Sequence, residues 1–149
     1  MLKRLVLFSI LLFILGCKKE AKNFYLVNIL NKELFDDAHI KGSINIPFSE
    51  LTTKASNWNK NAKIILYCSN YMCLASGEGA RQLNKLGFTN VYAYEAGMAE
   101  WYQEGLPTVG PCKKPYLKVK VEESEKSHDI VDISTKDLKD LLINEKILK

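Results

Sequence analysis

The sequence lacks a hydrophobic run long enough to cross a membrane. Its longest apolar stretch, Leu5 to Leu15, is interrupted by Ser9, and a membrane-spanning helix needs ~20 apolar residues. Two basic residues, Lys3 and Arg4, precede this stretch. A basic start, a short apolar run and a small residue at its end are typical of a secretory signal peptide. Residues 1–16 are therefore predicted to be a signal peptide.

The chain also lacks a net charge beyond residue 22. The formal net charge is +4, and residues 1–22 supply all of it through five basic residues and one acidic residue. From Asn23 onward, 16 of the 21 basic and 16 of the 17 acidic residues remain, and their charges cancel. Nucleic-acid binding needs a basic surface that neutralises phosphates. We therefore expect no nucleic-acid partner, and we interpret the N-terminal lysines as membrane-surface signals.

Histidine, cysteine and arginine are scarce, which limits the chemistry of the chain. There are two histidines and four cysteines. The pair Cys68 and Cys73 has no nearby histidine or further cysteine at the spacing of a zinc site, so we expect no metal. Arg81 is the only arginine after the predicted signal peptide. Phosphate ester hydrolysis is improbable, because no arginine stands between the two cysteines to bind an anion with two hydrogen bonds.

The end of the apolar stretch, Ile14-Leu15-Gly16-Cys17, resembles the bacterial lipobox. The resemblance implies that Cys17 is lipidated and begins a membrane-anchored, extracytoplasmic lipoprotein on the periplasmic side. Lys18 differs from the aspartate that retains many lipoproteins in the inner membrane of Gram-negative cells, so the outer membrane is favoured if the cell has two. The alternative is a hydrophobic N-terminal helix with an incidental cysteine.

Three regions follow residue 16. They are a polar tether over 17–23, a region over 24–110 with most of the large apolar side chains, and a charged C-terminal extension over 111–149. Within 24–110, the hydrophobic patterns predict short strands and amphipathic helices. The predicted strands are Phe24–Ile29, Ile44–Ile46, Ile64–Tyr67 and Val91–Tyr94, and the predicted helices are Ser76–Leu86 and Gly97–Glu104. Strands that alternate with helices favour an α/β fold with a doubly wound, mainly parallel sheet flanked by helices.

Cys68 stands where a predicted strand ends and a loop leads into a predicted helix. Ligands of open α/β sheets bind at the carboxyl ends of the strands. Unpaired backbone N–H groups and the helix dipole favour an anion there. We therefore expect the pKa of the Cys68 thiol to fall from its ordinary ~8.5 toward neutrality, which makes the sulfur reactive.

Several motifs in 24–110 resemble those of rhodanese-like domains. They are Asp-Ala-His-Ile-Lys-Gly-Ser-Ile-Asn-Ile-Pro over 37–47, Tyr67-Cys68, Leu86-Gly87-Phe88, and Gly-Met-Ala-Glu-Trp over 97–101. The resemblance implies a sulfurtransferase without metal or organic cofactor. Cys68 would take a sulfur from a thiosulfate-like or persulfide donor, hold it as a persulfide, and pass it to a thiol or other nucleophilic acceptor. The loop amides would stabilise the anionic sulfur.

The predicted active-site loop departs from the common family pattern. It holds no charged side chain and is longer than the common version; its residues are Ser69, Asn70, Tyr71, Met72, Cys73, Leu74, Ala75 and Ser76. For Cys73 two interpretations stay open: a disulfide or redox partner of Cys68, or a small apolar side chain packed under the loop. The alternative function is accordingly a binding or redox module that uses a Cys68/Cys73 dithiol–disulfide pair.

The charged extension contains two predicted elements. Tyr116 to Val121 alternates apolar and polar residues, which predicts a short strand. Ser134 is predicted to cap a helix in which Leu138, Leu141 and Leu142 follow helical spacing. We expect this helix to fold back on the domain. The alternatives are a solvated helix on a flexible tail and the start of a second domain.

Overall fold

The computed structural model describes residues 22–123 and 129–149. At its centre lies a five-stranded sheet in the order β3-β1-β4-β5-β7, with all neighbouring strands parallel. The strands are β1 (Phe24–Asn28), β3 (Ile44–Asn45), β4 (Lys63–Tyr67), β5 (Val91–Tyr94) and β7 (Val131–Asp132). Helices α1 (Lys32–Asp37), α2 (Leu51–Ala55), α3 (Ala75–Lys85), α4 (Gly97–Gln103) and α5 (Thr135–Asn144) surround it. The predicted α/β fold with a doubly wound parallel sheet is confirmed.

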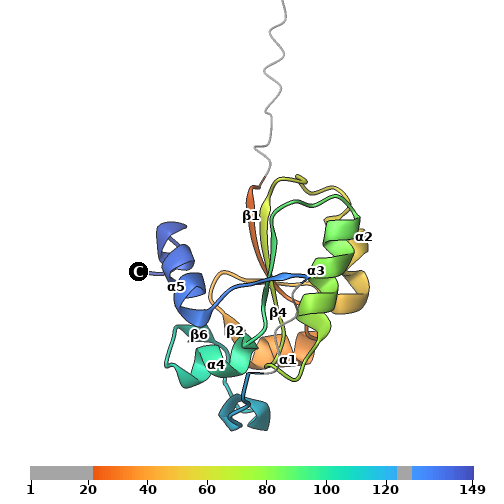
Figure 1. Ribbon diagram of the computed structural model, residues 1–149. Helices are drawn as coiled ribbons and strands as arrows, with labels where there is room; N and C mark the ends of the chain where they lie inside the picture. The colour runs from red at the N-terminus through yellow and green to blue at the C-terminus, as the bar shows by residue number, and fades with distance from the viewer. Residues whose placement is uncertain (1–21, 124–128) are drawn as a thin grey trace, which may run out of the picture.

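The two faces of the sheet carry separate hydrophobic cores. Figure 1 shows α2 and α3 on one face and α5 on the other. Side chains of β4 alternate between the faces, as the period of a strand requires: Ile64 and Leu66 pack with α2 and α3, whereas Ile65 packs with α4 and α5. Cys68 continues the alternation toward α3. The alternation of side chains along β4 therefore decides on which side of the sheet the Cys68 sulfur lies.

The strand and helix predictions for 24–110 agree with the structure to within one or two residues at their ends. The helix predicted over Ser76–Leu86 is α3, which ends before Gly87, a residue with φ of +86°. Such a left-handed conformation favours glycine. A small antiparallel ribbon of β2 (His39–Ile40) and β6 (Thr108–Val109) was not predicted, because two-residue strands leave no alternation in the sequence.

The strand predicted over Tyr116–Val121 is wrong. The chain forms a short 3₁₀ helix there, η2 (Pro115–Lys118), which buries Leu117 and leaves Val119 exposed; another, η1 (Phe48–Glu50), precedes α2. The free edge of β5 is occupied instead by β7, through Tyr92 and Val131. Proline favours the first turn of a helix because its φ is fixed and its nitrogen has no hydrogen to donate.

The C-terminal helix is present and packs on the sheet. The Asp137 backbone N–H donates to the Ser134 hydroxyl over 3.1 Å, which is the predicted cap. Leu138 and Leu142 are buried in the same core as Leu26 of β1. The alternatives of a solvated helix and of an unfinished second domain do not describe this arrangement. The charged extension thus contributes β7 to the sheet and α5 to one of its two faces.

The predicted signal peptide, most of the tether, and Cys17 lie outside the described residues. No helix within 22–123 or 129–149 is both long enough and apolar enough to cross a membrane.

Candidate functional site

Cys68 directly follows the last residue of β4, the strand that lies between β1 and β5 in the sheet. Two backbone N–H groups of α4 hold the start of the loop: Met98 donates to the Cys68 carbonyl and Ala99 to the Ser69 carbonyl, each over 2.9 Å. Gly97 allows this approach, because a Cβ there would lie 2.8 Å from loop backbone atoms and its φ is +66°. The base of the loop is therefore fixed to α4.

The Cys68 sulfur is fully buried and faces acceptors. Its side chain has 0% exposure, and the thiol donates to the Cys73 carbonyl over 3.0 Å. The Ser76 hydroxyl lies 3.6 Å from the sulfur. The side-chain hydrogen bond to Cys73, followed by burial, raises the pKa of Cys68 well above its ordinary value. The expectation of a lowered Cys68 pKa is wrong, because the contact with Cys73 and burial outweigh the lowering effect of the Ser76 hydroxyl and backbone N–H.

The lowered thiol pKa that the sequence predicted for Cys68 occurs at Cys73 instead. Its side chain is half-buried against the core beneath α3. The hydrogen bond from the Cys68 thiol lowers the pKa of Cys73 to about 5, with help from the backbone N–H groups of Ala75 and Ser69. Burial acts in the opposite direction and is outweighed. The interaction of the two thiols thus favours the thiolate at Cys73 over the thiolate at Cys68.

The cysteines of the described residues, Cys68, Cys73 and Cys112, are all free thiols. Cys73 is therefore not part of a disulfide in this state, and its side chain packs against the core, as one of the two interpretations expected. Cys112 lies away from the loop, where its thiol donates to the Gly110 carbonyl over 3.4 Å. The described part of the chain brings together no group of three or more metal-ligating side chains.

The tip of the loop is apolar and exposed. Met72 and Leu74 have exposures of 78% and 76%. Asn70 shapes the turn between the cysteines, because its side-chain oxygen accepts from the Met72 N–H over 3.1 Å and its carbonyl accepts from the Cys73 N–H over 2.9 Å. Ser76 is buried in the first turn of α3. The predicted loop thus surrounds the two thiols, and Met72 and Leu74 are its most exposed side chains.

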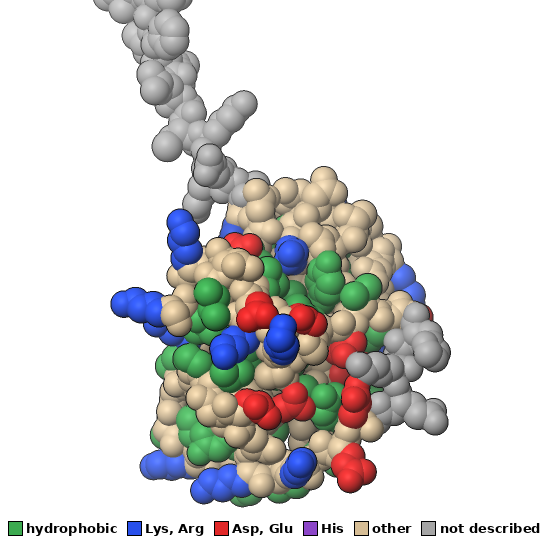
Figure 2. Space-filling model, turned by 60° about the vertical axis from the view of Figure 1, so that its left-hand side comes forward, with side chains coloured by type: hydrophobic (Ala, Val, Ile, Leu, Met, Phe, Trp, Pro, Cys, Tyr) green, Lys and Arg blue, Asp and Glu red, His purple; other side chains and the backbone are tan. Residues whose placement is uncertain are grey.

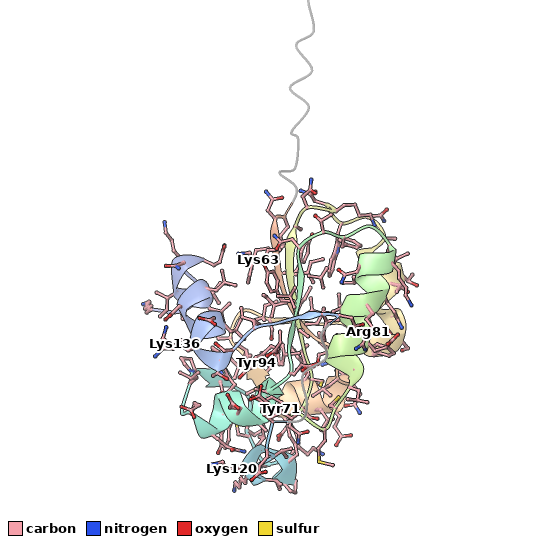
Figure 3. The ribbon with its side chains drawn as sticks, viewed as in Figure 1. Lys63, Tyr71, Arg81, Tyr94, Lys120 and Lys136 are labelled. Carbon is pink, nitrogen blue, oxygen red and sulfur yellow. The ribbon has the colours of Figure 1, made fainter. Side chains whose placement is uncertain are left out.

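Tyr71 connects the loop to residues that the sequence did not indicate. Its hydroxyl is hydrogen-bonded to Glu100 of α4, and burial together with that carboxylate raises the pKa of Tyr71. The Thr135 hydroxyl at the start of α5 donates to the same carboxylate and lies 2.8 Å from the Tyr94 hydroxyl. In Figure 3, Tyr71 and Tyr94 lie at the same end of the sheet, next to α4, and Lys63 lies at the opposite end.

A small cavity of ≈ 100 Å³ opens beside this connection. Its walls include Asn70 and Tyr71 of the loop, Glu100 of α4 and Lys120. On the face that includes α5, Figure 2 shows lysines next to Asp and Glu side chains rather than a field of one sign. Arg81 is paired with Asp129, with Nε–Oδ2 and Nη2–Oδ1 distances of 2.5 and 3.0 Å. The sequence indicated neither the cavity nor the pairing of Arg81 with Asp129, because each brings together residues from distant segments of the chain.

His39 does not contact the cysteines of the loop; its partner is Phe35. His39 stacks on Phe35 with ring centroids 3.9 Å apart, and its Nδ1 lies 2.8 Å from the Phe35 carbonyl oxygen. This is a structural contact. His128 lies outside the described residues.

Comparison with known proteins decides the family. Residues 16–104 match the model of the rhodanese-like domain. The chain belongs to the rhodanese-like family. An uncharacterized protein of Buchnera aphidicola is 31% identical, over 68% of this chain and 80% of its own. The thiosulfate sulfurtransferase GlpE of Shewanella oneidensis is 26% identical, over 56% and 81% respectively.

Solved structures agree with this assignment. The Alr3790 protein of Anabaena has a TM-score of 0.54 and 26% identity, over 59% of this chain and 68% of its own. The rhodanese-like chain spans less than two thirds of the length of other curated relatives that it matches, 39% of one and 59% of another. At the level of the family, these relatives associate the fold with sulfur transfer.

Proposed function

We propose that this protein is a sulfurtransferase that carries sulfur as a persulfide on Cys68. The observation that supports the proposal most strongly is the position of Cys68 at the carboxyl end of β4 in a rhodanese-like domain, hydrogen-bonded to a second thiol. Covalent catalysis needs a nucleophile whose charge is stabilised close to the reacting atom. The loop supplies such stabilisation at Cys73, the thiol beside Cys68, and the proposal needs no metal or cofactor.

The composition of the loop favours a persulfide over thiosulfate as the donor. Thiosulfate carries two negative charges, and residues 69–76 hold no charged side chain that would neutralise them. The exposed Met72 and Leu74 instead offer an apolar rim to the donor. A thiol persulfide, with a small charge at the reacting end, loses less solvation there than a dianion. The acceptor is a thiol or another nucleophile.

Mass spectrometry of the intact protein tests this function. After incubation with glutathione persulfide, the wild-type protein is expected to gain the mass of one sulfur atom, and thiosulfate at the same concentration is expected to load it more slowly. Cys68→Ser is expected to lose the stable persulfide, and Cys112→Ser is the matched control that keeps it. Stable loading in the Cys68→Ser protein would end the assignment of Cys68.

A redox module is the second candidate, and the contact between the Cys68 and Cys73 thiols favours it. In this function the pair alternates between a dithiol and a disulfide. Its signature is a loss of two protons under a mild oxidant, without any gain of sulfur from a persulfide donor.

Anchoring at a membrane surface is part of the proposal. It is supported by the lipobox resemblance at Ile14-Leu15-Gly16-Cys17, which implies a signal peptide over 1–16 and a lipidated Cys17 at the start of the tether. We expect Cys17→Ser to prevent lipidation of the protein in its own cell type. Normal lipid on the Cys17→Ser protein would contradict the anchor.

A further inference from the structure

We propose that Cys73 is the sulfur that first attacks the donor, and that Cys68 receives the transferred sulfur from Cys73. The inference rests on the proposed sulfur transfer and assigns its first step to a second catalytic residue. Its basis is the different surroundings of the two sulfurs within one loop.

Exposure separates the two cysteines. The Cys68 side chain has 0% exposure, and the Cys73 carbonyl and the Ser76 hydroxyl cover its sulfur. Cys73 is only half-buried, and it stands between Met72 and Leu74, the two most exposed hydrophobic residues of the described chain. A donor that arrives from solvent therefore meets Cys73 first, and it reaches Cys68 only after the loop opens.

More hydrogen-bond donors surround Cys73 than Cys68, where only the Ser76 hydroxyl and backbone N–H lower the pKa. The Cys68 thiol, the Ala75 and Ser69 backbone N–H groups and the Ser69 hydroxyl all lower the Cys73 pKa. Ala75 is the first residue of α3, so one of these N–H groups belongs to the helix end that favours an anion. At Cys68 the effect of the Ser76 donors is opposed by the Cys73 carbonyl oxygen, which lies 3.0 Å from the sulfur and would repel an anion there.

Ionisation alone does not decide which sulfur reacts. At pH 7 a thiol with an ordinary pKa of ~8.5 is ~3% thiolate, so full ionisation of Cys73 is a gain of ~30-fold. The intrinsic nucleophilicity of a thiolate falls with its pKa with a slope of ~0.4–0.5, so a pKa ~3.5 lower costs a similar ~30-fold. The two effects cancel, and the exposure of the sulfur decides the order of attack.

The transfer balances without any oxidant or reductant. The Cys73 thiolate attacks the outer sulfur of a persulfide RSSH, the donor S–S bond breaks, and RS⁻ leaves. The Cys68 sulfur, already hydrogen-bonded to Cys73, then attacks the outer sulfur of the Cys73 persulfide. The new S–S bond forms on Cys68 and the Cys73 thiolate is regenerated. The proton that Cys68 loses ends on RS⁻, and the products are RSH and the Cys68 persulfide.

Rapid quenching of the full-length protein with glutathione persulfide tests the order. Persulfides are trapped with an alkylating tag, and cleavage after Tyr71 places Cys68 and Cys73 on different peptides. In the wild-type protein the tag is expected on Cys73 first and on Cys68 later. Cys68→Ser is expected to accumulate a transient Cys73 persulfide at the wild-type initial rate. Cys73→Ser is expected to load Cys68 at least ~10-fold more slowly, because loading then waits for local opening of the loop.

Cys112→Ser is the matched control, since it removes a thiol outside the loop, and it is expected to follow the wild-type time course. Wild-type loading of Cys68 in the Cys73→Ser protein would overturn the role of Cys73 and leave the sulfurtransferase function intact. Formation of a Cys68–Cys73 disulfide with release of sulfide would overturn the internal transfer. Absence of sulfur from both cysteines in the wild-type protein would overturn the proposed function together with the inference.

Discussion

Replacement of Leu138 by alanine tests whether α5 is an integral part of the rhodanese-like domain. The Leu138 side chain is fully buried against the face of the sheet that carries Leu26 and Ile65. Leucine-to-alanine changes at such positions cost about 2–5 kcal/mol through lost transfer free energy and the cavity that remains. We expect a loss near 3 kcal/mol in the free energy of unfolding, which corresponds to a decrease in Tm of roughly 10 °C for a chain of this length.

Thermal unfolding followed by circular dichroism measures this change, and Ile143→Ala on the same helix is its control. Ile143 is 40% exposed, and surface substitutions usually change stability by less than ~0.5 kcal/mol. Alanine also favours the helix slightly over isoleucine. Equal Tm values for Leu138→Ala and Ile143→Ala would refute the docking of α5, because a helix in solvent does not distinguish its two sides.

Three further predictions concern the loop. The alkylation rate of Cys73 is expected to rise as pH increases through about 5 and to stay level above, since its lowered pKa leaves the thiolate present at higher pH; a midpoint near its ordinary pKa would contradict this. Gly97→Ala is expected to destabilise the domain and slow sulfur loading, because the new Cβ would lie 2.8 Å from loop backbone, whereas Gly105→Ala meets nothing within 4 Å and measures the cost of positive φ alone. Glu100→Gln is expected to lower the pKa of Tyr71 by removing a negative charge, and NMR titration of that tyrosine checks it.

The strands and the sheet were predictable because their physical signal is local. Each of the predicted strands is short and rich in branched residues, and Ile64–Tyr67 reappears within β4. The end of α3 was predictable because Gly87 supplies a conformation that other residues avoid. β7 was not predictable, because Val131 and Asp132 form a strand only where the edge of β5 offers them backbone partners.

The position of the site was predictable, but its electrostatics were not. A cysteine after a buried strand predicts a sulfur at the carboxyl edge of the sheet, and Cys68 lies there. The pKa of each sulfur depends on the path of the loop. The turn that Asn70 stabilises places the Cys73 carbonyl against Cys68 and two backbone N–H groups against Cys73. The contact between Glu100 and Thr135 joins residues 35 positions apart, and no local pattern encodes it.

The stability of α5 and the accessibility of Cys68 are physically connected. Cys68 becomes accessible only when the loop tip moves, and Tyr71 at that tip is hydrogen-bonded to Glu100. Thr135, in the first turn of α5, donates to the same carboxylate. Loosening α5 through Leu138→Ala removes support from Glu100 and lowers the cost of loop opening. The same substitution should therefore speed the alkylation of Cys68 and leave that of Cys73 nearly unchanged, since Cys73 is already partly exposed. Equal acceleration at both cysteines would indicate global unfolding and not a specific connection between α5 and the loop.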